Sequence, residues 1–223
     1  MTVQEIVTRV RAAIDELMQN DSDFLLESKD EGNLTAVIVD KIGYAWQHIV
    51  ENAPLNRLDS SMFETLTEQE LEEGFSIGDD LVGRLTIPVD LLRIIDARLS
   101  SWSHFPLPEP DTSQVYLMQQ DPYAKGSWDR PVNIITYNGS ARLLEMYSAK
   151  KKDDGLTFVF IRKPDTSDVS ADSMSTDVAV PAQLEGSLIY QVAGLTMLAF
   201  REDIAASLFA VAARYLDPKD DGK

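Results

Sequence analysis

Residues that could carry out chemistry are few in this chain, and they form no catalytic pattern. The chain has no cysteine and only two histidines, His48 and His104. This composition excludes thiolate metal centres, disulfides, cysteine nucleophiles and sites built from several histidines. A serine triad needs a histidine beside an activated serine, and no G-x-S-x-G segment accompanies either histidine. We therefore expect His48 to be an ordinary residue of a helix and His104 an ordinary residue of a proline-rich loop.

Several short segments match part of a known site and lack the rest. Ser148-Ala149-Lys150-Lys151 matches S-x-x-K, but it follows a strand and its partner motifs are missing. Asp21-Ser22-Asp23 lacks the other ligands of a calcium loop, and Asp79-Asp80 is typical of a solvated acidic loop. The glycines of residues 74–83 are not followed by the Gly-Lys-Ser/Thr of a phosphate loop. The sequence thus predicts no catalytic residue, no metal ligand, no cofactor-binding residue and no cofactor.

The charge of the chain is strongly negative and unevenly distributed. Among 223 residues, Asp and Glu number 37 and Lys and Arg number 20, a formal net charge of −17. Residues 1–80 hold 18 acidic and 5 basic residues (net −13), and residues 81–223 hold 19 and 15 (net −4). A general binder of nucleic-acid phosphates needs the opposite sign. The simplest interpretation of the acidity is a solubilising, solvated surface.

Helices are predicted at both ends of the chain. Thr2 and Glu5 form a capping box before an apolar stripe of helical spacing, and a second helix is expected over residues 33–52. Residues 54–81 are expected to be a loop with one acidic helical turn near 67–73. Residues 181–216 predict a helical hairpin that is interrupted at 201–203. We expect the four apolar stripes to share one core; they consist of Ile6/Val10/Ile14/Leu17, Leu34/Ile38/Ile42/Trp46, Leu184/Leu188/Val192/Leu195 and Ile204/Leu208/Val211/Tyr215.

The middle of the chain predicts strands. Residues 85–87 are extended before Pro88, and residues 94–99 have β-branched residues at strand spacing. Residues 132–137 and 142–147 flank Asn138-Gly139, a strong signal for a two-residue hairpin loop. That loop would set Ile134 opposite Leu143. Residues 156–161 are expected to add a third strand to this hairpin as a β-meander.

The order of these elements predicts an α+β fold with a helical bundle from both termini and an inserted antiparallel β-domain. The expected domains are residues 1–81 and 178–223 for the bundle and 82–164 for the β-domain. Residues 165–177 are poor in apolar residues and are expected to be a flexible linker or loop. The start of the chain lacks the apolar core of a secretory signal, and the apolar stretch 188–200 is shorter than the ~20 residues of a membrane span. We therefore expect no membrane partner.

The middle and end of the chain also contain a series of short motifs in a recognisable order. Their sequence segments are Leu85-Thr86-Ile87-Pro88-Val89-Asp90-Leu91-Leu92-Arg93-Ile94, Leu99-Ser100-Ser101-Trp102, Arg130-Pro131-Val132, Leu143-Leu144-Glu145-Met146-Tyr147, Phe158 to Lys163 with Pro164, and Phe200-Arg201-Glu202-Asp203-Ile204-Ala205-Ala206. In this order, over about residues 1–216, the chain resembles the head–tail connector proteins (adaptor or ring proteins) of tailed phages, notably those of crAss-like phages.

The resemblance implies a structural virion protein rather than an enzyme. It implies a homo-oligomeric ring, of twelve copies, that docks below the portal protein in the neck of the virion, contacts further ring or tail proteins and forms part of the DNA ejection channel. Such a ring surrounds DNA without reading its sequence, and it is made in the cytoplasm of the host bacterium. The family pattern has no catalytic residue, so none is transferred to this chain.

Two other classes of function remain open at the level of sequence. One is an intracellular adaptor or protein-interaction module of a bacterium, without a virion role, in which the C-terminal helical hairpin binds a partner helix. The other is an enzyme with sparse carboxylate chemistry. A ring protein differs from both because it requires a large homo-oligomer or an ordered assembly on a portal.

Overall fold

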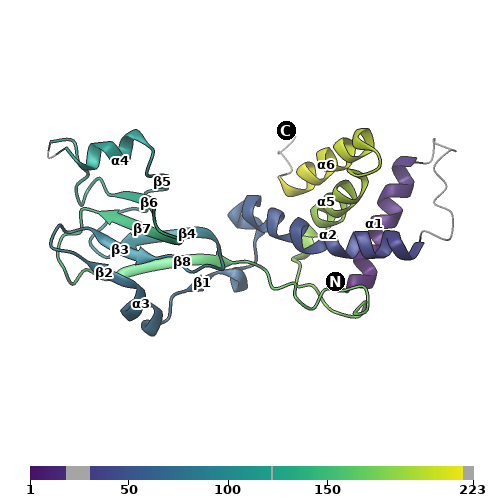
Figure 1. The fold of residues 1–223 in the computed structure, drawn as a ribbon, viewed down its shortest axis with the longest axis horizontal. Helices are drawn as coiled ribbons and strands as arrows, with labels where there is room; N and C mark the ends of the chain where they lie inside the picture. Colours follow the sequence, from purple (N-terminus) through teal and green to yellow (C-terminus); the bar gives the residue numbers. More distant parts are fainter. Residues whose placement is uncertain (19–30, 122, 218–223) are drawn as a thin grey trace. The chain divides into compact units, whose positions relative to one another are not determined.

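The computed structural model describes residues 1–18, 31–121 and 123–217 (Figure 1). The chain divides into two compact units. Residues Met1–Ser60 and Pro164–Lys223 form the helical unit, and residues Ser61–Lys163 form the sheet unit. The predicted α+β class, with helices at both termini and an inserted sheet region, is confirmed.

The first boundary between the units lies about 20 residues earlier than the expected 81/82 boundary, at Ser60/Ser61. The reason is that residues 64–77 are not a free loop. Strand β1 (Glu64–Thr65) pairs with β8 (Leu156–Arg162), and β2 (Phe75–Ile77) pairs with β3 (Gly83–Thr86). Helix α3 (Glu68–Gly74) lies between β1 and β2 in sequence, so this whole acidic stretch belongs to the sheet unit.

Among its described residues, the helical unit has four longer helices from the two ends of the chain. They are α1 (Val3–Met18), α2 (Glu31–Asn52), α5 (Glu185–Met197) and α6 (Glu202–Leu216), with the short 3-10 helices η1 (Leu55–Arg57) and η3 (Ala182–Leu184). Helix α1 begins at the predicted capping box: the amide of Thr2 donates to Glu5 Oε2 at 2.8 Å, and the amide of Glu5 donates to Thr2 Oγ1 at 3.2 Å. Figure 1 shows α5 and α6 beside α1 and α2.

Helix α5 is the centre of this unit, because it packs against α1, α2 and α6. Its fully buried residues include Leu188, Val192 and Ala193. A side chain at Gly194 would place its Cβ 2.5 Å from the Phe209 ring, so the glycine permits the close approach of α6. The expected shared core of the helical stripes is present, with only their ends, such as Leu17, exposed to solvent.

Backbone hydrogen bonds join the start of the chain to the segment before α5. The amides of Val3 and Gln4 donate to the carbonyls of Thr176 and Met174, both at 2.9 Å, and the amide of Val178 donates to the carbonyl of Met1 at 2.8 Å. The segment 165–177, expected to be a flexible linker, therefore lies in the helical unit, and its last residues pair with the chain start.

The described strands of the sheet unit form two sheets. The first has the strand order β1-β8-β4, with β4 at Leu91–Leu99. The second has the order β2-β3-β7-β6-β5, with β7 at Ala141–Tyr147, β6 at Val132–Asn138 and β5 at Pro108–Pro110. Helix α4 (Gln114–Gln119) follows β5, and η2 (Ser60–Met62) precedes the first strand. All pairs are antiparallel except β5 with β6, which are parallel.

Two details of strand pairing differ from the sequence-based expectation. Strand β8 does not extend the β6–β7 hairpin, because it pairs with β4 and β1 in the other sheet. The hairpin turns at Gly139-Ser140, with Asn138 paired to Ala141, so Ile134 lies opposite Glu145 rather than Leu143. Gly139 has φ 61°, and a glycine with positive φ at the first loop position is the pattern of a type II′ turn.

One core joins the two sheets. Its buried side chains include Leu99, Phe158 and Phe160 from one sheet and Leu144 and Met146 from the other. Each sheet has one apolar face, formed by alternate residues of its strands, that must be shielded from water. The apolar faces of the two sheets pack against each other. The sheet unit is therefore a small two-layer structure with its polar residues on the outer faces and in the loops.

Replacement of Trp46 by alanine tests the core of the helical unit. Trp46 on α2 is 2% exposed, so Trp46→Ala should lower the free energy of unfolding by about 3–5 kcal/mol through lost burial and a cavity. Tyr44→Ala on the same helix removes an aromatic ring that is 69% exposed and should change stability by less than about 0.5 kcal/mol. Urea unfolding measures both values, and equal effects of the two substitutions would contradict this packing.

Hydrogen exchange tests the pairing of the chain start with the segment before α5. We expect the amides of Val3, Gln4 and Val178 to exchange more slowly than those of residues 167–173, whose described bonds are local turns. Removal of the first four residues should speed exchange at Val178. Unchanged exchange at Val178 after this truncation would show that the pairing does not protect it.

Candidate functional site

The structure gives each sequence-level candidate for catalysis an ordinary partner. Ser148 Oγ donates to the carbonyl of Gly126 at 2.6 Å, and Lys150 Nζ lies 5.1 Å from the centre of the Trp128 ring. Lys151, the lysine of the S-x-x-K match, pairs with Asp153 at 3.3 Å. Both histidines are exposed. His48 Nδ1 lies 3.2 Å from Asn52 Nδ2, and His104 Nδ1 lies 3.2 Å from Ser103 Oγ.

The candidate metal ligands are also engaged with neighbours. Asp79 pairs with Lys152, and Asp80 Oδ2 accepts from Arg84 Nη2 at 2.6 Å. This contact with Arg84 holds the pKa of Asp80 below its usual value. Asp21 to Asp23 lie outside the described residues. Among the residues that the structure does describe, no group of three or more His, Cys, Asp or Glu side chains could hold a metal ion.

The motif residues that carry the phage resemblance make structural contacts within the sheet unit. Trp102 is 5% exposed and donates from Nε1 to the carbonyl of Ser148 at 3.3 Å. The hydroxyl of Tyr147 donates to Glu145 Oε2 at 2.7 Å, and Glu145 Oε1 accepts from Arg84 Nε at 3.3 Å. Burial, and then the Glu145 carboxylate, raise the pKa of Tyr147. These side chains thus stabilise the β3–β7 face and the strand ends.

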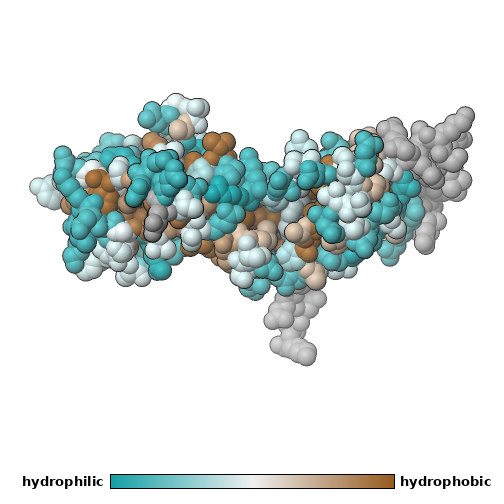
Figure 2. Space-filling view, turned by 90° about the horizontal axis from the view of Figure 1, so that it is seen from below, coloured by the Kyte–Doolittle hydropathy of each residue, from teal (hydrophilic) through white to brown (hydrophobic). Residues whose placement is uncertain are grey.

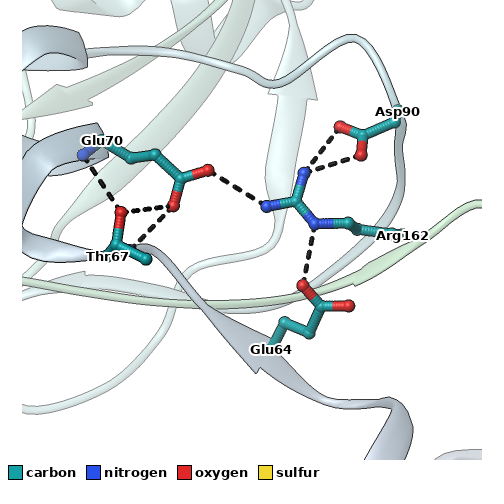
Figure 3. A network of polar contacts seen from close by, with 5 residues as sticks. All are labelled: Glu64, Thr67, Glu70, Asp90 and Arg162. Atoms are coloured by element: carbon teal, nitrogen blue, oxygen red, sulfur yellow. Dashed lines mark hydrogen bonds and ion pairs between the residues drawn. The ribbon is translucent and has the colours of Figure 1, made fainter.

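Arg162 at the end of β8 binds three carboxylates from different elements (Figure 3). It donates from Nη1 to Asp90 at 2.7 and 2.8 Å, from Nε to Glu64 at 2.8 Å, and from Nη2 to Glu70 at 3.1 Å. Glu70 also completes a capping box with Thr67, whose amide donates to it at 2.8 Å. The Thr67 amide and hydroxyl, and then Arg162, lower the pKa of Glu70. This Arg162 network joins β1, α3 and the turn before β4 to β8.

A buried carboxylate, that of Asp154, fixes the turn after β4. Asp154 is 3% exposed; it accepts from Ser100 Oγ at 2.6 Å and the amide of Ser101 at 3.1 Å, and it also binds the Ser101 hydroxyl. Burial raises its pKa, but the bonds from Ser100 and Ser101 outweigh burial and hold the pKa below the usual value. Asp154 therefore acts as a buried structural anion that positions the residues before Trp102.

The sheet unit also has an open groove, which we call the Trp128 groove. It has a volume of about 450 Å³ and is lined by Asp80, Leu81, Val82, Gln119, Lys125, Gly126, Ser127, Trp128, Tyr147, Ser148 and Ala149. Leu81 and Ser148 have φ of 57° and 74°, which non-glycine residues adopt at some cost. The amide of Ala149, the residue after Ser148, donates to the carbonyl of Leu81 at 2.9 Å. This bond links the two segments that contain the positive-φ residues.

The Trp128 groove combines apolar and basic groups. Trp128 is 51% exposed and Leu81 is 37% exposed, and the ammonium group of Lys150 lies over the Trp128 ring. Lys125 also lines the groove. Groups of this kind can bind an acidic segment with an apolar side chain.

A second groove lies in the helical unit. It has a volume of about 590 Å³ between α1, η3, α5 and α6. Tyr190 and Tyr215 stack at its edge with ring centres 5.5 Å apart, and Arg9 pairs with Glu185 at 2.7 Å. On the face seen in Figure 2, hydrophobic residues lie in clusters among a mostly hydrophilic surface.

The sequence did not reveal either the Arg162 network or the Trp128 groove. In the sequence Lys150 belongs only to the incomplete S-x-x-K match, whereas in the structure it contacts Trp128. The available signal was weak: a tryptophan and lysines in the loops of a net-acidic chain.

No family model and no curated protein matches the sequence. Within the described residues, none of the helices has the length and apolar content needed to cross a membrane. The described site geometry consists of the Arg162 network, the buried Asp154 carboxylate and two open grooves.

Replacement of Arg162 by methionine tests the Arg162 network. At pH 7 Arg162→Met should destabilise the protein by about 1–3 kcal/mol, because three carboxylates lose their shared cation. The pKa of Glu70 is held below its usual value, so its contribution to stability is present above the unfolded value of about 4.3 and is lost as pH falls through the folded pKa. The difference between variant and wild type should therefore shrink below about pH 4.

Urea unfolding at pH 7 and pH 3 measures this difference. Arg98→Met is the matched control, because Arg98 is 44% exposed and, among the residues that the structure describes, pairs with Asp96 alone at 3.2 Å. It should cost less than about 1 kcal/mol at either pH. A cost of Arg162→Met that stays constant from pH 7 to pH 3 would argue against the carboxylates as its cause.

Proposed function

We propose that this chain is a structural head–tail connector protein of a tailed phage, a ring or adaptor protein that joins the portal to the tail. In this role it forms part of the channel through which DNA leaves the head. The observation that carries the proposal is the order of the motifs over about residues 1–216. It is supported by the partners of the motif residues: Asp90, Trp102 and Tyr147 all make contacts that hold the scaffold together.

The proposed assembly is a homo-oligomeric ring of twelve copies in the virion neck, below the portal protein and next to further ring or tail proteins. The chain would be made in the cytoplasm of the host bacterium. A ring requires each copy to present two different surfaces to its neighbours. The expectation that these contacts come from the β-domain is based on its nearly balanced charge in residues 81–164.

The charge of the two units supports a role around DNA rather than on DNA. The helical unit has 21 acidic and 9 basic residues, a net charge of −12, and the sheet unit has 16 and 11, a net charge of −5. A weakly repelling wall lets DNA pass, whereas basic contacts would hold its phosphates. Screening over about 8 Å at physiological salt limits this repulsion to DNA close to the wall.

The alternative is an intracellular adaptor module without a virion role. The observation that favours it is the groove of the helical unit beside Tyr190 and Tyr215. Aromatic-lined grooves bind extended or helical peptides. An adaptor of this kind would act as a small particle with one peptide partner, so its mass separates it from a ring.

Electron microscopy of the purified chain mixed with the portal protein of the same genome tests the proposal. The expected result is a ring of additional density on one face of the portal, with the portal's symmetry or a symmetry matched to it. A portal mixed with an unrelated acidic protein of similar size is the control. A chain that stays monomeric and never binds the portal would refute the proposal.

Binding to duplex DNA gives a second test. A chain of net charge −17 that only surrounds DNA should show no retention of duplex DNA at about 150 mM salt, and lowering the salt to about 50 mM should not produce tight binding. Fluorescence anisotropy of a labelled duplex measures this. Tight binding that weakens steeply with salt would contradict the proposed passive channel.

A further inference from the structure

Two basic groups lie at the Trp128 groove: Lys125 lines it, and Lys150 lies over the Trp128 ring, whereas the acidic lining residue Asp80 is paired with Arg84. In the part of the chain that the structure describes, Lys125 and Lys150 form no ion pair, whereas the neighbouring Lys151 and Lys152 pair with Asp153 and Asp79. An exposed lysine needs no partner, but two of them beside a half-exposed tryptophan form a local basic and apolar surface on an acidic protein.

The apolar part of this surface continues onto α4. This helix contributes Gln119 to the groove, and its Leu117 and Met118 are 61% and 49% exposed. Aromatic and methionine side chains are enriched in protein interfaces. The surface therefore fits a protein segment with acidic residues around an apolar anchor.

The end of α1 has the complementary character. Its last turns carry Asp15, Glu16 and Leu17, and no basic residue lies in the last turn. Leu17 is 41% exposed, and among the described ion pairs neither acid has a basic partner. Acidic residues near a helix C-terminus interact unfavourably with the helix dipole. A cation beside these acids would therefore stabilise the end of α1.

We propose that the α1 end of one copy, residues Asp15 to Leu17, binds in the Trp128 groove of a second copy. Lys125 and Lys150 would pair with the two acids, and Leu17 would pack on Trp128. The groove belongs to the sheet unit and the α1 end to the helical unit, so the contact is heterologous and each copy offers both halves of it. Contacts of this type close into rings or continue as filaments.

This inference rests on the proposed function for its biological setting, because a ring is built from such head-to-tail contacts. It also refines the expectation that subunit contacts come from the β-domain alone. Here the sheet unit supplies the basic half, and the acidity of the helical unit becomes a source of attraction between neighbours.

A charge exchange tests the contact. We expect Lys125→Glu with Lys150→Glu to weaken association between copies by about tenfold or more, and Asp15→Lys with Glu16→Lys to do the same. The combination of all four changes should restore association to within about threefold of wild type. Analytical ultracentrifugation over a range of protein concentrations measures these shifts.

The variants are suited to this test because they should fold. Lysines at 15 and 16 match the helix dipole better than the acids they replace, so loss of association in that variant cannot be attributed to a weaker helix. The matched control, Lys41→Glu with Lys163→Glu, makes the same charge change outside the groove and should leave association within about threefold of wild type. Failure of the four-residue exchange to restore association would overturn the contact.

Cross-linking gives the position of the contact directly, since the chain has no cysteine of its own. Ser127→Cys in a tagged copy, mixed with Leu17→Cys in an untagged copy and treated with a short bis-maleimide, should give a mixed dimer. The pair Ser127→Cys with Ala36→Cys, which places the second thiol on an exposed position of α2, should give at least tenfold less. An equal yield from both pairs, or no mixed dimer, would overturn the contact.

Further outcomes separate this inference from the proposed function. A double-cysteine chain that cross-links only within itself would show that the groove binds its own α1 end, and would overturn the contact between copies. Rings on the portal that form unchanged with Lys125→Glu and Lys150→Glu would reject this contact but keep the connector role. Copies that associate through the contact and never bind a portal would support the contact and reject the role.

Discussion

Burial of α5 is the interaction on which the helical unit depends. This helix comes late in the chain, yet it packs against α1 and α2 from the chain start as well as against α6. Its buried residues occupy more than one face, so it cannot be stable in solvent without partners on several sides. The two ends of the chain must therefore fold together, and the pairing of Val3 with Thr176 fastens them. The sheet unit lies within one inserted stretch as a consequence.

In the sheet unit, charged side chains that are buried or shared hold segments together that are distant in sequence. Arg162 holds three carboxylates that precede it by 72 to 98 residues, and Asp154 holds the turn of Ser100 and Ser101. Removal of one member leaves like charges, or a buried anion, without compensation. Asp90 and the residues just before Trp102 belong to the motifs that carry the resemblance to phage connectors. Their contacts hold the end of β8 and the turn after β4 in place.

The helix starts could be predicted from the sequence because they depend on residues that are close together in the chain. The capping box of Thr2 and Glu5 marks the start of α1, and Thr67 with Glu70 marks α3 in the predicted acidic turn. Strand partners were harder, since β8 pairs with β4 and β1 across long sequence separations. The predicted hairpin register was wrong because the loop is Gly139-Ser140 and not Asn138-Gly139. Gly139, with its positive φ, occupies the first loop position. The Trp128 groove has no motif at all, because residues 80–149 form it only after folding.

The central claim is a structural role in the neck of a phage particle, where a chain of net charge −17 surrounds DNA and contacts copies of itself. Its most direct test is quantitative mass spectrometry of purified virions, followed by cryo-electron microscopy of their necks. The account predicts that the chain is present in the same copy number as the portal protein and that its α+β fold fits a ring directly below the portal. Absence of the chain from purified virions, with the protein present only in the cytoplasm of infected or uninfected cells, would contradict it.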